Sequence, residues 1–476
     1  MSKNIILNCD SYKVTHSKQY PENMEYMHSY IESRGGLYGY VKFFGLQYYL
    51  KEYLTKKVTK EMVDEAEEIF ALHQVPFDRT GWDYIVNELN GNIPLRIRAV
   101  AEGAVIPNHN VLVTIESTDK KVPWIVSWLE SLILKVWYPT TVATYSYKSK
   151  QIIKYFLDQT SDNVESELPF KLHDFGYRGA SSDETAGLGG LAHLTNFKGT
   201  DNINALEFGR KYYSEKIAGF SIPAAEHSTI TSWGRDREKD AMENILNKFP
   251  TGPVSIVCDS YDFFNAVENI IGKELKDKIK NRDGVVIVRP DSGDAITNIL
   301  FALEKLENSF GVTVNSKGYK VLNNTRVIQG DNVYENTTWD ILKCLMNNDY
   351  AIDNIALGCG GSLLQGNNNS SINRDTHKFA MKCSCVKIDN KFIDVSKNPI
   401  TDSGKVSKKG RLDLIKDANG EYKTVNITYL PENKYHPNSL LTTVFENGQL
   451  LVDYTLEQVI QNEDKYFVPE LKRVKY

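Results

Sequence analysis

The first candidate for chemistry is a histidine set among small and polar side chains. Ser221–Trp233 reads SIPAAEHSTITSW, so Glu226 and His227 follow Pro-Ala-Ala and precede two hydroxyl side chains. Imidazole titrates near neutral pH and acts as a base, a metal ligand or a nucleophile, and small neighbours leave room for a ligand. The alternative is a histidine that is only hydrogen-bonded at the end of a strand. This stretch alone does not distinguish a reactive histidine from a structural one. The elements that surround it in the fold are needed for that distinction.

Six short apolar runs in the middle of the chain have the length of strands. Helical patterns with apolar residues on one face separate them. Alternating strands and helices are typical of βα units, and six units are enough to close, or nearly close, a TIM-like β/α barrel. The runs are Phe170–Leu172, Phe220–Ile222, Val254–Val257, Val285–Val288, Arg326–Ile328 and Ile355–Leu357.

Polar or glycine-rich residues follow every one of these runs. The carboxyl ends of parallel strands lie at one edge of a sheet, so residues far apart in sequence converge there. Taken singly, an aspartate after a strand can simply cap the next helix, and a glycine can simply make a turn. Because all six runs share the feature, we predict a site at that edge. The segments are His173–Gly176, Pro223–His227, Asp259–Ser260, Arg289–Gly293, Gln329–Asp331 and Gly358–Ser362.

These segments carry groups suited to a phosphorylated sugar beside an aromatic base. The glycines after the last run present backbone N–H groups to an anion. Arg178 and Arg289 can stack on a planar ring or pair with phosphate, and Asp291 and Asp331 can accept hydrogen bonds from a ribose diol. Phe175 offers a face to a flat heterocycle.

The composition favours an enzyme that acts on small molecules. The 476 residues are 41% hydrophobic and 25% charged, and the net charge of −5 gives no basic excess for nucleic acid. No segment approaches the roughly 20 apolar residues that span a bilayer, and the amino terminus has too short an apolar run for a signal peptide. Six cysteines are too few for a disulfide framework, and none has a partner pair at zinc spacing. We therefore expect a cytoplasmic protein.

The length predicts more than one domain. Residues 1–150 mix helical periodicity with short strands, and residues 381–476 return to strands and loops. We predict that these two segments together form an additional mixed α+β domain. Residues 151–380 would form the β/α barrel and carry the catalytic groups.

Eight runs, in order along nearly the whole chain, closely resemble the nicotinamide phosphoribosyltransferases, a family of type II phosphoribosyltransferases. The resemblance implies a homodimer with a β/α barrel and active sites at the subunit interface. It also implies transfer of the phosphoribosyl group of phosphoribosyl pyrophosphate (PRPP) to nicotinamide in NAD salvage, giving nicotinamide mononucleotide (NMN) and pyrophosphate, with Mg²⁺ neutralising the pyrophosphate. The runs are Asp10–His16, Lys171–Gly179, Asn196–Asn202, Ser221–Ile230, Val254–Asp262, Ile287–Asp294, Arg326–Asp331 and Ser407–Leu412.

The resemblance assigns a pyridine site. Phe175 and Arg289 would sandwich the ring, and Tyr12 would close the pocket from the partner subunit. Asp201 would accept a hydrogen bond from the carboxamide NH₂ of nicotinamide, whereas nicotinate would bring a second carboxylate against it. Substrate choice is therefore predicted to depend on Asp201.

The resemblance makes His227 the residue that ATP phosphorylates, which couples ATP hydrolysis to tighter substrate binding. Asp259 would hold one ring nitrogen and leave the other free to attack the γ-phosphoryl group. Asp291 would bind the ribose hydroxyls or the Mg²⁺ shell. The other predicted contacts to the phosphoribosyl and pyrophosphate groups are Arg34, Arg178, Ser221, Ser255, Gly330, Asp331, Gly360, Gly361, Arg374, Lys382 and Lys397.

Two departures from the family pattern affect the phosphate site, and two alternative functions remain open. The polar insertion Gly366–Asn373 directly precedes Arg374, and Cys359 and Ser362 stand where the family has Ser and Gly. One alternative is a nicotinate phosphoribosyltransferase, against which Asp201 argues. The other is a non-catalytic nucleotide-binding barrel, against which the retained histidine, arginine and aspartates of the predicted site argue.

Overall fold

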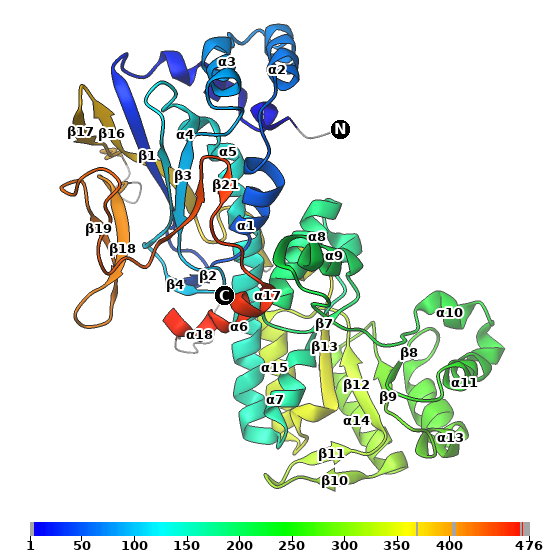
Figure 1. Cartoon of the computed structure of the whole chain (residues 1–476). Helices are drawn as coiled ribbons and strands as arrows, with labels where there is room; N and C mark the ends of the chain where they lie inside the picture. Colours follow the sequence, from blue (N-terminus) through cyan, green and yellow to red (C-terminus); the bar gives the residue numbers. More distant parts are fainter. Residues whose placement is uncertain (1–3, 368–369, 402–405, 467–468, 470–476) are drawn as a thin grey trace. The chain divides into compact units, whose positions relative to one another are not determined.

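The computed structural model describes residues 4–367, 370–401, 406–466 and 469, which fall into two compact units (Figure 1). Of the described residues, the first comprises those up to Thr144, Lys211–Glu215 and those from Asn373 to Pro469, and the second Tyr145–Arg210 and those from Lys216 to Ile372. The long helix α6 (Trp137–Thr160) runs from one into the other. Each unit is described below by itself.

The first unit is built on an antiparallel sheet of seven strands in the order β17-β16-β1-β5-β3-β20-β21. Its long strand β1 is almost wholly buried, which explains why it lacks the alternating pattern of a half-exposed strand. The strands are β1 (Met24–Ser33), β3 (Leu95–Ala99), β5 (Val111–Ser117), β16 (Phe379–Ile388), β17 (Lys391–Asp394), β20 (Thr442–Glu446) and β21 (Gln449–Leu450).

Short pairs and helices complete the first unit. Trp82, Trp124 and Trp128 are buried and pack against one another with ring centroids 5.1–5.6 Å apart. The elements are β2 (Tyr40–Lys42) paired with β4 (Val105–Pro107), β18 (Leu412–Lys416) paired with β19 (Tyr422–Asn426), and α1 (Leu46–Tyr49), α2 (Lys60–Leu72), α3 (Arg79–Asn87), α4 (Ile125–Trp128), α5 (Glu130–Ile133), α17 (Leu456–Gln461) and α18 (Glu463–Tyr466).

Buried hydrogen bonds explain why Lys211–Glu215 belongs to the first unit. The carbonyl oxygen of Tyr212 accepts from Gln47 Nε2 at 2.7 Å, and the Tyr213 hydroxyl donates to Glu102 Oε2 at 2.7 Å. The same carboxylate of Glu102 accepts from the backbone N–H groups of Gly45 and Gln47. Since each of these groups would be costly to bury without its partner, the segment is anchored there.

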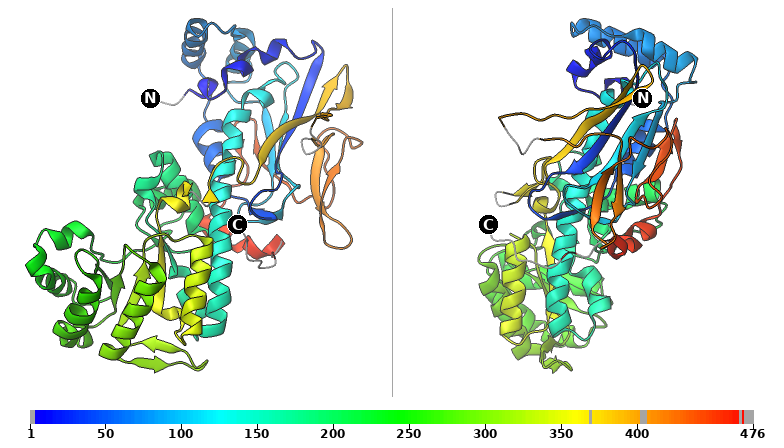
Figure 2. Two further views of the ribbon diagram at one scale, coloured as in Figure 1. Left: turned by 180° about the vertical axis from the view of Figure 1, so that it is seen from behind. Right: turned by 90° about the vertical axis from the view of Figure 1, so that its left-hand side faces the viewer.

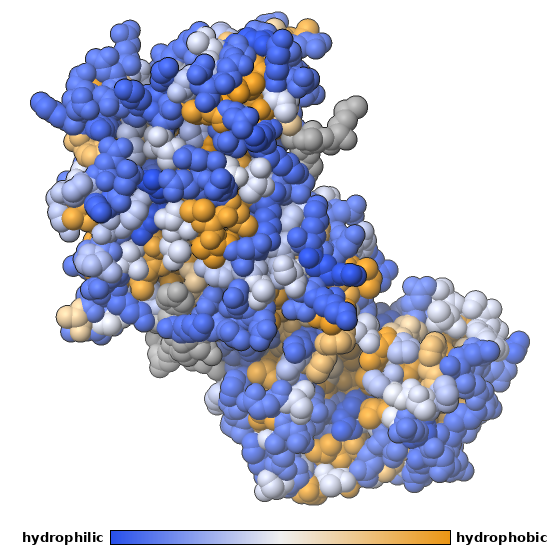
Figure 3. All heavy atoms as spheres, in the orientation of Figure 1, coloured by the Kyte–Doolittle hydropathy of each residue, from blue (hydrophilic) through white to orange (hydrophobic). Residues whose placement is uncertain are grey.

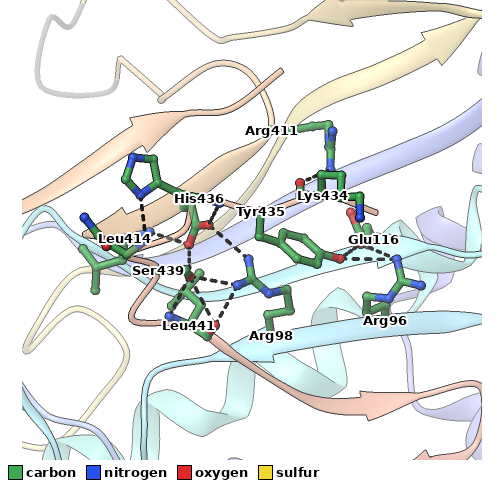
Figure 4. A network of polar contacts seen from close by, with 12 residues as sticks. Arg96, Arg98, Glu116, Arg411, Leu414, Lys434, Tyr435, His436, Ser439 and Leu441 are labelled. Atoms are coloured by element: carbon green, nitrogen blue, oxygen red, sulfur yellow. Dashed lines mark hydrogen bonds and ion pairs between the residues drawn. The ribbon is translucent and has the colours of Figure 1, made fainter. Parts of the chain in front are cut away.

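A polar network holds the segment after β19 against the first sheet (Figure 4). Arg98 donates to the Leu441 carbonyl at 2.7 Å and stacks on Tyr435, with its guanidinium carbon 3.5 Å from the ring centroid. It also faces Asp413 Oδ2 at 3.4 Å, and Asp413 is fully buried. Asp413 in turn accepts from the backbone N–H of His436 at 3.1 Å. A buried arginine thus joins strand β3 to residues far along the chain.

Replacing Arg98 by methionine is expected to lower the free energy of unfolding by about 3–5 kcal/mol, because the buried Asp413 carboxylate would lose its opposing charge. Urea denaturation of wild type and variant measures the change. Arg79→Met is the matched control, since Arg79 forms three ion pairs at the surface of the same unit, with Asp64, Glu67 and Asp83. The control should cost about 1 kcal/mol or less. Equal losses for the two variants would contradict a structural role for the buried pair.

The second unit holds a parallel sheet of six strands in the order β7-β6-β13-β12-β9-β8 (Figure 1). The prediction of an α/β chain with a parallel sheet and a further α+β part is confirmed. Val254–Val257 forms a strand at the predicted residues, and the strands predicted near residues 286, 326 and 355 shift by at most two residues at an end. The strands are β6 (Leu172–Asp174), β7 (Gly199–Thr200), β8 (Val254–Val257), β9 (Val286–Arg289), β12 (Thr325–Gln329) and β13 (Ile355–Cys359).

Two predicted strands differ from the structure. Leu168–Phe170 forms a 3-10 turn around Pro169, so strand β6 begins only at Leu172. Phe220–Ile222 forms no extended ladder. Phe220 forms a single bridge to Gly199 of β7, and Ala224 forms a single bridge to Ser255 of β8. Pro223, which has no N–H to donate, interrupts the pairing between these bridges. The segment nevertheless touches both edges of the sheet.

Helices flank the parallel strands of the second unit, as the two further views also show (Figure 2). Helix α14 packs on β12 and on α15. The helices are α7 (Val164–Glu167), α8 (Asp183–Leu194), α9 (Ile203–Tyr213), α10 (His227–Thr231), α11 (Glu238–Lys248), α12 (Phe263–Asn265), α13 (Lys276–Lys280), α14 (Ala295–Phe310), α15 (Glu335–Asn347) and α16 (Gly361–Leu364). The strand pairs β10 (Val312–Val314) with β11 (Lys320–Leu322) and β14 (Gly366–Asn367) with β15 (Ser370–Ser371) lie outside the sheet.

The surface, the helices and the cysteines add three observations. The face seen in Figure 3 is mostly hydrophilic, with separate apolar patches. No helix in the described part of the chain is long and apolar enough to cross a membrane. All six cysteines are free thiols.

Candidate active site

His227 is the first residue of helix α10 and is held by a buried aspartate. Its Nε2 lies 3.0 Å from Asp259 Oδ1; Asp259 follows β8 and has 6% of its side chain exposed, against 46% for His227. The other oxygen of Asp259 accepts from the Asp291 backbone N–H at 3.2 Å and from the Ser292 hydroxyl at 2.5 Å. Among the described residues, His227 Nδ1 has no hydrogen-bond partner. The arrangement fixes one ring nitrogen and leaves the other available for chemistry.

A second carboxylate, Asp201, follows strand β7 and takes two hydrogen bonds on one oxygen. His173 Nε2 lies 3.1 Å from Asp201 Oδ1, and the Ser221 hydroxyl donates to the same oxygen. Burial acts to raise the pKa of Asp201, but these two hydrogen bonds and the positive charge of Arg289 outweigh it and lower the pKa below its ordinary value. Asp201 is therefore ionised at neutral pH. Of its side chain, 45% is exposed.

Phe175 and Arg289 meet over glycines at the carboxyl ends of the strands. A Cβ added to Gly330 would lie 3.8 Å from the Phe175 ring, 3.6 Å from Arg289 Cδ and 2.8 Å from Asp291 Oδ1. A Cβ on Gly358 would lie only 2.0 Å from Phe175 Cε2, so glycine is required there for the ring to take its place. Arg289 is 15% exposed and its Nε has no hydrogen-bond partner in the structure. An aromatic ring and a planar cation thus lie together where a flat ligand can enter.

The glycine-rich segment after β13 presents backbone rather than side chains. A Cβ on Gly179 would lie 2.7 Å from Gly361 Cα, whereas the Cβ position of Gly360 is open. Cys359 and Ser362, the two departures from the family pattern, turn towards the Val333 carbonyl, with Sγ and Oγ at 3.2 and 3.3 Å. Burial raises the pKa of Cys359 to about 12, so it is a neutral thiol. Neither substitution places a charged group among the exposed N–H groups.

Other predicted residues of the second unit fall into two groups. Asp331 follows β12 and its carbonyl accepts from Gln329 Nε2 at 2.8 Å, while Arg178 is exposed in the turn after Phe175. Both lie at the same strand ends as the groups above. Ser255 does not: it lies within β8, is 5% exposed, and its backbone pairs with Pro223 and Ala225.

Four of the predicted cations lie near one another in the first unit. Burial lowers the pKa of Lys382, and the positive charges of Arg34, Arg374 and Lys397 lower it further, with Glu130 opposing them. Each of these three positive charges therefore lies near enough to Lys382 to repel its ammonium group. Arg34 is oriented by Glu32, whose Oε1 accepts from Arg34 Nε at 2.8 Å.

Two further cationic and aromatic groups belong to this unit. Lys408 pairs with the same buried carboxylate of Glu32 as Arg34. Tyr12 is 60% exposed and lies edge-on to His16 at 5.3 Å. Its exposure suits a role towards a ligand.

His173 is a site residue that the sequence reasoning did not single out. It was visible only as the first polar residue after a predicted strand, where alternation did not say which way its ring points. A cavity of about 430 Å³ inside the second unit is also lined by His173 and Ser221, together with Ile287, Val327 and Ala356. The described part of the chain contains no cluster of three or more His, Cys, Asp or Glu side chains that could hold a metal.

Comparison with known proteins places this arrangement among phosphoribosyltransferases. The profile of the nicotinate phosphoribosyltransferase (NAPRTase) family matches residues 170–449, and that of the nicotinamide phosphoribosyltransferase N-terminal domain matches residues 4–97. A nicotinamide phosphoribosyltransferase of Xanthomonas campestris is 50% identical over 97% of this chain and 98% of its own. One from Mycoplasma genitalium is 32% identical over 85% and 94%.

Solved structures share the fold at low identity. A nicotinate-nucleotide pyrophosphorylase from Pyrococcus furiosus aligns with a TM-score of 0.59 at 14% identity, covering 97% of this chain and 95% of that one. Human nicotinic acid phosphoribosyltransferase aligns with a TM-score of 0.56 at 14% identity, covering 96% and 92%. At this identity the likeness concerns the fold alone.

Proposed function

Because the chain belongs to the nicotinate phosphoribosyltransferase family, and within it to the nicotinamide phosphoribosyltransferases, we propose that it transfers the phosphoribosyl group of PRPP to nicotinamide, giving NMN and pyrophosphate. The observation that carries the choice of pyridine is Asp201: an ionised carboxylate with one oxygen anchored and the other without a partner among the described residues. Such a group accepts a hydrogen bond from a carboxamide and repels a carboxylate.

The pyridine ring would lie between Phe175 and Arg289, which are already side by side over Gly330. The free oxygen of Asp201 would then accept from the carboxamide NH₂. Tyr12 of a partner subunit would cover the ring, in a homodimer with active sites at the subunit interface. The second unit would form a β/α barrel, closed by the segment from Phe220 to Ala224 that bridges the edge strands β7 and β8.

The reaction needs positioning and charge stabilisation more than acid–base chemistry. The pyridine nitrogen attacks C1′, the new N–C1′ bond forms, and the C1′–O bond breaks with its electron pair leaving on pyrophosphate. Asp291 and Asp331 would accept from the ribose hydroxyls, and the N–H groups at Gly330, Gly360 and Gly361 would bind the 5′-phosphate. The cations for the pyrophosphate would be Arg34, Arg374, Lys382 and Lys397, with Arg178 at the phosphoribosyl group.

Mg²⁺ would supply charge neutralisation to the departing pyrophosphate. Asp291 is 30% exposed, and its Oδ2 lies 3.8 Å from Arg289 Nη2. Since one aspartate is not a metal cage, the residues fit a cation whose other ligands come from the phosphate oxygens of the substrate. The chain's own contribution is to hold those phosphates.

His227 would be phosphorylated by ATP. The geometry supports attack by Nδ1 on the γ-phosphorus, with the N–P bond forming as the bond to the ADP oxygen breaks, because Asp259 already holds Nε2. Asp259 stabilises the positive charge that develops on the ring. Cytoplasmic ATP would then drive a reaction that forms a high-energy nucleotide from dilute nicotinamide.

Mass-spectrometric measurement of NMN tests both the choice of pyridine substrate and the role of His227. The purified protein should form NMN from nicotinamide and PRPP and should use nicotinate far less well; equal use of the two pyridines would refute the assignment. ATP should raise NMN formation by wild type, and His227→Ala should lose this stimulation while retaining measurable transfer. If ATP has the same effect on both proteins, His227 is not the phosphoryl acceptor.

A further inference from the structure

His173 is built into the pyridine site although it touches no reacting atom of the proposed reaction. It stands at the second position of strand β6, paired in register with Gly199 of β7, two residues before Asp201. From there its Nε2 reaches Asp201 Oδ1 at 3.1 Å. The ring therefore links two neighbouring strands at the level of the ligand.

The His173 ring is confined on two sides and largely buried. A Cβ on Gly199 would lie 2.8 Å from His173 Nδ1, so the ring occupies space that only glycine leaves open. On another side its centroid lies 4.9 Å from that of Phe175, the proposed ring platform. Only 14% of its side chain is exposed. A side chain held in this way offers its N–H in one direction, towards Asp201.

Asp201 itself is far less confined, since 45% of its side chain is exposed. A short carboxylate at such a position would otherwise change rotamer freely, and ordering it on binding would weaken affinity. The backbone N–H of Asp201 donates to the Asp174 carbonyl at 2.9 Å, which fixes its main chain but not its side chain. Side-chain order must therefore come from His173 and Ser221, which both bond to Oδ1.

We propose that His173 is the positioning residue that determines specificity for nicotinamide: by occupying Oδ1 of Asp201 it directs Oδ2 at the carboxamide of the substrate. This inference rests on the proposed function. Its physical basis is that two donors on one oxygen leave a single acceptor, already oriented, for the substrate NH₂. The same hydrogen bonds favour the ionised carboxylate, so Asp201 has no proton to share with a nicotinate carboxylate.

The test compares His173→Leu, which removes the donor, with His173→Gln, whose amide N–H reaches to a similar distance. For His173→Leu we expect KM for nicotinamide to rise about tenfold, with kcat and KM for PRPP changed less than threefold, as for a lost hydrogen bond to a charged group. The ratio of kcat/KM for nicotinamide to that for nicotinate should fall by a similar factor. His173→Gln should restore most of both quantities. Thermal unfolding of each variant checks that the fold is intact.

A double-mutant cycle separates positioning from a general structural role. In an Asp201→Asn background, His173→Leu should no longer change the ratio between the two pyridines. The inference is wrong if folded His173→Leu keeps the wild-type ratio, or if it lowers kcat equally for both pyridines, or if His173→Gln is no better than leucine. Failure of the proposed function would look different, because wild type itself would then show no preference for nicotinamide.

Discussion

Gly358→Ala is expected to lower kcat/KM for NMN formation about 100-fold while leaving the protein folded. The added Cβ would lie 2.0 Å from Phe175 Cε2, so the ring must leave its place. Because the obstructing atom is the far end of a side chain, the chain can relax at modest cost in stability, but the platform for the pyridine is lost. A misplacement of about 1 Å in a binding group is enough for a loss of this size.

Steady-state kinetics with a thermal unfolding control measures this effect. Gly39→Ala is the matched substitution, since Gly39 is exposed and its Cβ position has no neighbour within 4 Å; its kinetics should be those of wild type. The double variant Gly358→Ala with Phe175→Ala should be no worse than Phe175→Ala alone, because without the ring there is nothing to displace. Additive losses in the double variant would show that Gly358 acts by some other route.

The second large effect is expected for Asp201→Asn, which should lower the preference for nicotinamide over nicotinate about 100-fold, or about 2.7 kcal/mol in discrimination. The variant loses a charged acceptor for the carboxamide and the repulsion of the nicotinate carboxylate, and it gains an amide donor. Competition between the two pyridines, followed by mass spectrometry of both mononucleotides, gives the ratio directly.

Asp158→Asn serves as control for this experiment. Asp158 lies on α6 of the second unit, is paired at the surface with Lys154 and is about half exposed, so its loss of charge should leave the ratio unchanged. An unchanged ratio in Asp201→Asn would mean that pyridine choice is made by another group.

Much of the second unit followed from the sequence because its strands are short, buried and regularly spaced. Val254–Val257 is buried throughout, with three apolar residues around Ser255, and it belongs to a parallel sheet, whose strands are expected to be buried in this way. The strand predicted at Phe220–Ile222 was wrong as a strand, since Pro223 limits the pairing to single bridges. Local propensity predicts an apolar extended segment. It does not predict whether the backbone of that segment can form a continuous hydrogen-bonded ladder with the adjacent strands.

The site was predictable in part. Sequence order alone indicated that residues after different strands converge, and the bond between His227 and Asp259 fits that expectation. The role of His173 could not be read in this way, because at a strand end the direction of a side chain depends on which strand lies beside it. Ser255 belongs to a matching motif and lies buried within strand β8, and its contact to the phosphoribosyl group stays a prediction.

The interleaving of the two units in sequence bears on how the protein is made. Strand β1 pairs on one side with β5 and on the other with β16, which the ribosome delivers only after all six parallel strands of the second unit. At a synthesis rate of about 5–20 residues per second, β16 is made many seconds after β1, so the edge of β1 that pairs with β16 stays unpaired for that time. An unpaired apolar strand is prone to join other chains. Completion of the first sheet therefore comes only after the strands of the second unit have been synthesised, which gives the second unit the opportunity to fold first.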